Sequence, residues 1–263
     1  MNRIRIVSLY SGSTGNSTLV ETPLGAILID AGKSARSLCA ALKQAGSSAD
    51  KIKAVFVTHE HTDHVSALEV FLKKNPVPVH ITSISAENLH ILPDSRLSSA
   101  LRTHTPIYSE SVIGLTVTSF PVSHDSAMCV GYRIETEDGF SFGLATDTGC
   151  ITEAMIEGLG GCEAVVIESN HSVEKLRCGP YPEMLKRRIL SRSGHLSNDD
   201  CATLIRILAE KGTKSFLLAH ISRENNDHAC AVESAKKALE GFEGISLFTA
   251  KPETETEFVV KVQ

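Results

Sequence analysis

Residues 58–64 read Thr-His-Glu-His-Thr-Asp-His and hold three imidazoles and two carboxylates directly after an apolar run. In an extended segment, residues two apart point the same way, so His59 and His61 can converge on one ion. If the chain then turns into a helix, Asp63 and His64 face a neighbouring position. Neutral imidazole and carboxylate suit Zn²⁺, Mn²⁺ or Fe²⁺. Because such a cluster would be costly at the end of a buried strand without a partner, the segment predicts a metal centre rather than a polar loop.

The pattern His-x-His-x-Asp-His after an apolar strand resembles the signature of the metallo-β-lactamase superfamily. Four further motifs of that superfamily match this chain in the same order. They contain Asp30, His124, Asp147 and His220. The resemblance therefore extends over essentially the whole chain.

The resemblance implies two divalent ions per chain, Zn, Mn or Fe, whose identity the sequence leaves open. One ion would be held by His59, His61 and His124. The other would be held by Asp63, His64 and His220. Asp147 would bridge both ions, together with a hydroxide. Asp30 would orient a liganding histidine from behind without binding metal itself.

Two departures narrow the class within the superfamily. True β-lactamases of this fold place a Cys at the second ion and are exported, whereas this chain has Asp147 and no export signal. The flavodiiron branch has a carboxylate where His61 stands, which disfavours oxygen or nitric-oxide reduction. Thiolester hydrolases of the glyoxalase II type share the full ligand set, so the ligands leave that activity open.

The segment 193–200, Ser-Gly-His-Leu-Ser-Asn-Asp-Asp, favours a phosphodiester substrate. Ser197 with Asp200 has the form of a capping box before an apolar run. His195 would then lie beside a helix N-terminus, where free N–H groups and the dipole favour an anion such as phosphate. Phosphodiesterases of the superfamily carry a similar extra histidine in this interval.

Residues 174–192 contain six basic and two acidic residues, a net charge of +4 on a chain that totals −5. Local positive charge of this kind is what phosphate-backbone binding requires. We therefore expect substrate contacts from this region and from residues near His195. The candidates are Ser197, His171, Lys186, Arg187, Arg188 and Arg192.

Within the superfamily, the motifs are most similar to those of the bacterial YycJ/WalJ (VicX) family. That family implies a 5′-to-3′ exonuclease on double-stranded DNA that uses a hydroxide bridged by two metal ions. Asp63, Asp147 and His195 are the expected catalytic residues, with His195 as a donor to a phosphate or leaving oxygen. Other phosphodiesterases of the fold (RNA processing or cyclic phosphate), a thiolester or lactone hydrolase, and a non-catalytic module binding metal and DNA remain open alternatives.

The elements that must position these residues alternate between strands and helices. Strands are predicted at 3–9, 26–30, 54–58, 164–167 and 216–219, at several places between 112 and 147, and in the C-terminal tail. Helices are predicted at 34–45, 65–74, 182–192, 198–210 and 228–240. Asp138-Gly139 predicts a hairpin. This order favours one α/β domain over residues 1–263, a four-layer αββα sandwich with mixed sheets packed face to face and helices outside.

The amino-acid composition argues against several classes of protein. The chain has 263 residues, 42% of them hydrophobic, and 26 basic against 31 acidic residues, which excludes a uniformly basic nucleic-acid coat. Seven scattered cysteines without a Cys-x-x-Cys pair predict free thiols in a reducing compartment. With no signal peptide and no long apolar stretch, we expect a cytoplasmic protein without membrane contact. The oligomeric state stays open.

Overall fold

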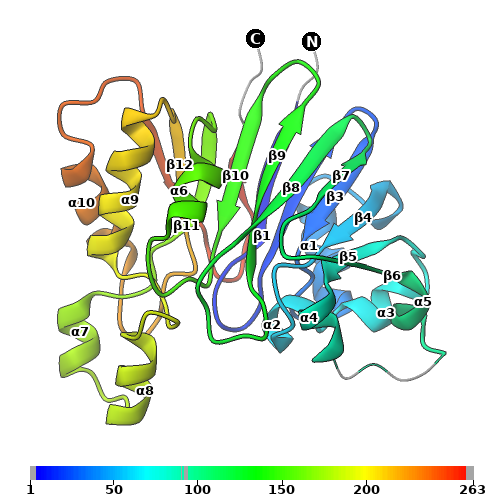
Figure 1. Ribbon diagram of the computed structural model, residues 1–263, viewed down its shortest axis with the longest axis horizontal. Helices are drawn as coiled ribbons and strands as arrows, with labels where there is room; N and C mark the ends of the chain where they lie inside the picture. Colours follow the sequence, from blue (N-terminus) through cyan, green and yellow to red (C-terminus); the bar gives the residue numbers. More distant parts are fainter. Residues whose placement is uncertain (1–3, 90, 92–93, 259–263) are drawn as a thin grey trace.

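The computed structural model describes residues 4–89, 91 and 94–258. It shows two seven-stranded sheets packed face to face, with helices on their outer faces (Figure 1). This arrangement confirms the predicted α/β class and the sandwich of mixed sheets. Within the described residues, no helix has the length and apolarity needed to cross a bilayer.

The first sheet has the order β14-β1-β2-β3-β4-β5-β6. Its strands are β1 (Arg5–Tyr10), β2 (Ser17–Thr22), β3 (Gly25–Ile29), β4 (Ile52–Phe56), β5 (Val79–Thr82), β6 (Leu101–His104) and β14 (Thr256–Phe258). The second sheet has the order β13-β12-β11-β10-β9-β8-β7. Its strands are β7 (Ser109–Val112), β8 (Leu115–Pro121), β9 (Val130–Thr136), β10 (Ser141–Ala145), β11 (Ala164–Glu168), β12 (Ser215–Ala219) and β13 (Ser246–Thr249).

The helices lie between these strands in the chain. They are α1 (Ala35–Gln44), α2 (Thr62–Val65), α3 (Leu68–Leu72), α4 (Ser83–Glu87), α5 (Arg96–Ala100), α6 (Glu153–Leu159), α7 (Val173–Cys178), α8 (Glu183–Ile189), α9 (Asn198–Glu210) and α10 (His228–Ala238).

Apolar side chains fill three layers of the molecule. Phe56, Tyr132 and Leu144 belong to the cluster between the sheets. Leu38 of α1 and Leu204 of α9 belong to the two outer clusters, which lie under the helices. Because each sheet is buried on both faces, its central strands are nearly continuous apolar runs, as the sequence shows.

The topology brings loops from both sheets to one edge of the sandwich. β3, β4, β5 and β6 are parallel, and so are β10, β11, β12 and β13. The carboxyl ends of parallel strands meet at one edge, where crevices for ligands form. The chain passes from the first sheet to the second between β6 and β7, and it returns between β13 and β14.

Several predicted elements have different bounds in the structure. The predicted helix 65–74 is two short helices, α2 and α3. Ala67 N–H donates to Ala31 O (2.9 Å) and Ser66 Oγ donates to Lys33 O (2.5 Å), which ties this bend to the loop after β3. The predicted helix 182–192 ends at Ile189, whose carbonyl accepts from His195 N–H (3.0 Å). The hairpin at Asp138-Gly139 is confirmed, with Gly139 at φ 91° between β9 and β10.

Candidate metal centre

Three imidazoles meet where β4, α2 and the loop after β8 come together. The ring centroids of His59 and His61 are 4.6 Å apart, and that of His124 lies 5.0 Å from His59 and 5.2 Å from His61. One nitrogen of each ring lies within 4.8 Å of the others. The structure thus brings together the three histidines that the sequence assigns to one ion.

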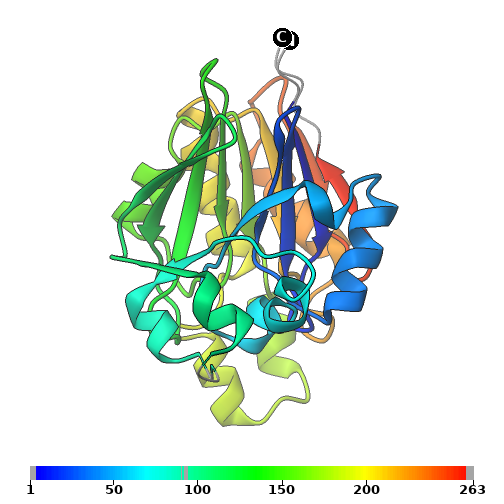
Figure 2. The ribbon, with the colours of Figure 1, turned by 90° about the vertical axis from the view of Figure 1, so that its right-hand side faces the viewer.

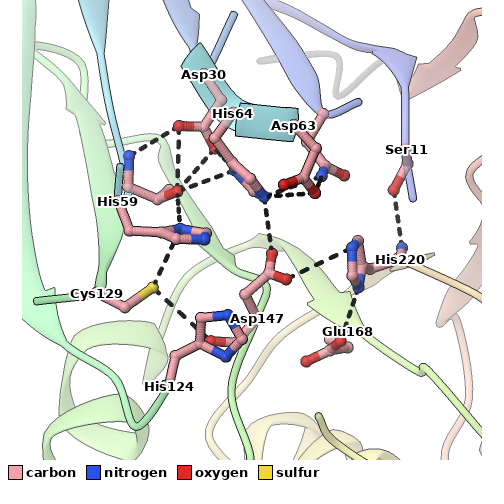
Figure 3. A network of polar contacts seen from close by, with 12 residues as sticks. Ser11, Asp30, His59, Asp63, His64, His124, Cys129, Asp147, Glu168 and His220 are labelled. Atoms are coloured by element: carbon pink, nitrogen blue, oxygen red, sulfur yellow. Dashed lines mark hydrogen bonds and ion pairs between the residues drawn. The ribbon is translucent and has the colours of Figure 1, made fainter. Parts of the chain in front are cut away.

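A second group surrounds the carboxylate of Asp147 (Figure 3). His64 Nε2 lies 3.3 Å from Asp147 Oδ2 and 3.4 Å from Asp63 Oδ2. His220 Nε2 lies 3.5 Å from Asp147 Oδ1. Asp147 thus contacts both His64 and His220, and His64 offers a ligand atom within 4.8 Å of those of His59 and Asp147. Asp63 approaches this group through its contact with His64.

The backbone conformation at three strand ends directs these side chains. Asp30, Asp147 and His220 have φ angles of 61°, 56° and 53°. Such left-handed conformations are uncommon for residues other than glycine and cluster at functional sites. Asp30 and His220 directly follow β3 and β12, and Asp147 comes two residues after β10.

Asp30 supports the centre from behind, as Figure 3 shows. Its carboxylate lies 2.8 Å from His64 Nδ1 and accepts from Thr58 N–H (2.8 Å) and the Thr58 hydroxyl (2.9 Å). Burial lowers the pKa of His64, but the carboxylates of Asp30 and Asp147 outweigh it and hold the pKa well above its usual value. The contact fixes the His64 ring with Nε2 toward Asp147.

Glu168, at the end of β11, is a functional residue that the sequence interpretation did not assign. It is fully buried, and its Oε1 lies 2.7 Å from His195 Nδ1 and 2.9 Å from His220 Nδ1. Its Oε2 accepts from Thr148 N–H (2.9 Å) and Leu196 N–H (3.3 Å). Burial raises the pKa of Glu168, but the two imidazoles outweigh it and lower the pKa to about 2.

Three buried atoms of the two groups have no hydrogen-bond partner among the described residues: His59 Nε2, Asp147 Oδ2 and His220 Nε2. An unsatisfied buried polar atom is costly, and divalent cations bound at the two groups would satisfy these atoms. Burial, together with the nearby His64, lowers the pKa of His59 well below its usual value, which favours the neutral, ligating imidazole. The donor set of imidazole and carboxylate thus fits divalent metal ions.

Of the remaining predicted residues, His195 lies at the centre itself, with its Nδ1 3.7 Å from Asp147 Oδ1 and its ring 5.2 Å from those of His124 and His220. His195 is the more accessible partner of Glu168, with 17% of its side chain exposed. Ser197 caps α9 as predicted, its hydroxyl accepting from Asp200 N–H (3.1 Å). His171 is 1% exposed and forms a β-bridge with Ser197, and neither ring nitrogen has a partner among the described residues. His171 thus pairs with Ser197, and His195 lies two residues before Ser197 in the same segment.

The four basic candidates lie on and after α8. Lys186 and Arg188 form ion pairs with Glu183 and Asp125. Arg187 and Arg192 are exposed.

Two facing sheets, helices on their outer faces and a His- and Asp-rich cluster at the shared edge define the class of αββα sandwiches with a candidate metal site. The comparison with family models identifies the family: the Beta-lactamase superfamily domain matches residues 26–221. The chain belongs to this superfamily, as the sequence motifs predict.

The curated relatives carry a more specific name. The chain is 36% identical over 234 residues to Exodeoxyribonuclease YycJ of Bacillus anthracis, covering 88% of each chain. It is also 36% identical over 223 residues to Exodeoxyribonuclease WalJ of Streptococcus pneumoniae serotype 2, covering 83% of this chain and 81% of the relative. The predicted similarity to the YycJ/WalJ family is confirmed.

Solved structures share the fold at low sequence identity. The metallo-β-lactamase fold protein YhfI from Bacillus subtilis has a TM-score of 0.75 at 16% identity, covering 98% of this chain and 100% of its own. The human short-form tRNase Z has a TM-score of 0.64 at 12% identity, covering 95% and 98%. At these identities the likeness shows the fold alone.

Proposed function

We propose that this protein is a metal-dependent phosphodiester hydrolase that degrades double-stranded DNA as a 5′-to-3′ exonuclease. The names of its relatives at 36% identity support an exodeoxyribonuclease activity. The observation that carries the proposal is the Glu168–His195 pair beside the clustered metal-ligating side chains around Asp147 and His59. A centre for metal binding alone would not need an accessible, oriented imidazole next to it.

The predicted ligands divide between two divalent ions as their positions suggest. His59, His61 and His124 would hold one, Asp63, His64 and His220 the other, and Asp147 would contact both. Bound ions would supply Lewis acidity, which activates water and neutralises charge on a phosphate. A phosphate group of the DNA would bind beside these ions.

His195 is the proposed proton donor to the leaving oxygen. Its Nδ1 contacts Glu168, so that its Nε2 remains the nitrogen available for substrate. Burial lowers the pKa of His195, but Glu168 outweighs it and raises the pKa, which favours the protonated ring that a proton donor needs. Glu168 is a positioning residue, because it acts through His195 and His220 rather than on substrate.

The test is hydrolysis of duplexes labelled at the 5′ or 3′ end, with protein supplied with Mn²⁺ or Zn²⁺ and its metal content measured. We expect release of label from the 5′ end first. A variant with both His59→Ala and Asp147→Ala should lose the activity, and the exposed His228→Ala should retain it. Unchanged activity in the double variant would overturn the proposal.

The same assay separates the alternatives. Cleavage confined to RNA or to cyclic phosphates would indicate another phosphodiesterase, and cleavage of thiolesters or lactones without DNA would indicate a glyoxalase II type. Tight metal and DNA binding with no turnover in either metal would indicate a binding module.

A further inference from the structure

The helical hairpin of α7 and α8 projects from the sandwich at the edge that holds the metal centre. Both views show it extending beyond the ends of the strands (Figures 1 and 2). It is held to the body by a small apolar contact, since Leu176 and Ile189 are its buried hydrophobic side chains. Most of the hairpin surface is exposed, including Met184 at 86%.

The C-terminal end of the hairpin is tied to the loops of the metal centre. Arg192 O accepts from the Ser123 hydroxyl (2.8 Å), and Gly194 O lies 3.1 Å from His124 Nδ1. Gly194 also packs so closely that an added Cβ would lie 2.2 Å from Ile189 O. The segment after α8 therefore contacts His124 directly and leads into His195, the residue after Gly194.

Ion pairs divide the six basic residues of this region into two groups. Lys175 pairs with Asp227, Lys186 with Glu183, and Arg188 with Asp125. Lys186 Nζ also donates to Arg177 O (2.8 Å) and so joins the two helices. These three residues hold the hairpin together and against the body.

Arg177, Arg187 and Arg192 form the second group. All three are exposed, and no carboxylate in the described part of the chain lies within ion-pair distance of them. An arginine without an internal counterion can neutralise a phosphate without first breaking an ion pair. Its guanidinium fork also matches phosphate geometry.

We propose that the α7–α8 hairpin is a DNA-binding arm in which Arg177, Arg187 and Arg192 contact backbone phosphates, while Lys175, Lys186 and Arg188 position the arm. The inference rests on the proposed function, since it places the duplex beside the same centre. It also assigns Arg177 to the substrate contacts and moves Lys186 and Arg188 from that role to a structural one.

The test is equilibrium binding of a fluorescent blunt duplex with phosphorothioate linkages to the metal-loaded protein, measured by anisotropy over a range of salt concentrations. Each lost phosphate contact lowers the slope of log K against log salt by about 0.9. A triple variant, Arg177→Gln with Arg187→Gln and Arg192→Gln, should lower the slope by about 2.7 and weaken binding at low salt at least about tenfold.

The matched control removes the same charge at the opposite edge of the molecule. Lys43, Lys236 and Lys237 lie exposed in the last turns of α1 and α10, and these helices run away from the metal-centre loops. Their triple Gln variant should keep the wild-type slope, and replacing the three arginines by lysine should restore most of it. Metal content and the unfolding midpoint verify that each variant is folded.

Equal salt slopes for the arginine variant and the lysine control would overturn the proposal of a DNA-binding arm. The proposed nuclease activity would not be affected by that result. A wild-type protein that cuts no DNA under any metal would instead overturn the proposed function, whatever the slopes show.

Discussion

One buried carboxylate, Glu168, sets the state of two imidazoles that have different roles. Its Oε1 contacts both His195 and His220, which come from segments 27 and 52 residues further along the chain. Burial lowers the pKa of His220, but Asp147 and Glu168 outweigh it and raise the pKa to about 9 in the metal-free protein. A single substitution here should therefore change both proton donation and metal binding.

We predict that Glu168→Gln lowers kcat by at least about tenfold, within the range typical of general acid catalysis. Without the carboxylate, the pKa of His195 falls, so the alkaline limb of the kcat–pH profile should move to lower pH. The measurement is the profile of both proteins at saturating metal. A lower kcat with an unchanged profile would mean that Glu168 acts only on the fold.

Asp30 supports His64 without facing the centre. We predict that Asp30→Asn weakens binding of a metal ion at His64 by about 10- to 100-fold, because the amide nitrogen cannot accept from His64 Nδ1. Competition with a chelator measures this affinity. The exposed Asp50→Asn is the control, and equal affinities for the two variants would contradict the role of Asp30.

At this scale the sequence indicated the histidines and aspartates that the structure brings close together, and Asp30 behind them, but not Glu168. Residues 59–64 could be identified as candidate metal ligands because three histidines and an aspartate within six residues form an unusual pattern. Glu168 follows a buried strand as a single acidic residue, and nothing near it in the chain indicates His195 or His220. Only the parallel pairing of β10, β11 and β12 brings these partners together.

At the scale of the elements, two loops of the first sheet are packed backbone against backbone. Gly32 lies so close to α2 and to the loop after β1 that an added Cβ would be 1.9 Å from Asp63 O and 2.7 Å from Asn16 N. Neither atom belongs to a flexible side chain. The loop after β3 and the segment carrying Asp63 must therefore move together.

We predict that Gly32→Ala destabilises the protein by about 3 kcal/mol or more, at the upper end for overpacked sites, and lowers metal affinity as Asp63 shifts. Gly241→Ala, with φ 89° and open space around it, should cost only about 1 kcal/mol from backbone strain. Urea unfolding of both variants measures the difference. Equal losses would show that the loops can separate.

The long, regular elements were the most predictable ones. The helices at 34–45 and 198–210 appear close to their predicted bounds, and Ser197 caps the second one as predicted. The helix α7 was not predicted, because its six residues bury only Leu176 and carry little periodicity. The break between α2 and α3 depends on contacts with the 31–33 loop, which no local pattern indicates.

At the scale of the whole molecule, polar side chains cluster where the chain first passes between the sheets. His80 Nδ1 on β5 lies 3.0 Å from His104 Nε2 on β6, and Glu110 on β7 lies 3.8 Å from His104 Nδ1. Burial, His104 and Arg102 together lower the pKa of His80 to about 4, against the opposing effect of Glu110. The sequence interpretation assigned neither histidine a role.

We predict that this site contributes to acid sensitivity. Because the pKa of His80 is lower in the folded chain than its ordinary 6.5, the unfolded chain binds more protons between these values, and stability falls as pH drops from 6.5 to 4. The contribution is at most about 3 kcal/mol. Urea unfolding of His80→Leu across this range should show a flatter pH dependence than wild type, whereas the exposed His228→Leu should not.

The left-handed backbone at Asp30, Asp147 and His220 lowers the stability of the fold at positions whose side chains the proposed chemistry needs. Side chains there cost roughly 1–2 kcal/mol each relative to glycine. A mutant library selected for heat resistance in a metal chelator should therefore accumulate glycine at position 147 or 220, whereas selection for DNA cleavage should keep both side chains. Asp30 should persist in both pools, because its carboxylate also accepts from the buried Thr58 N–H. Sequencing both pools would reveal where evolution has accepted a less durable protein in exchange for its chemistry.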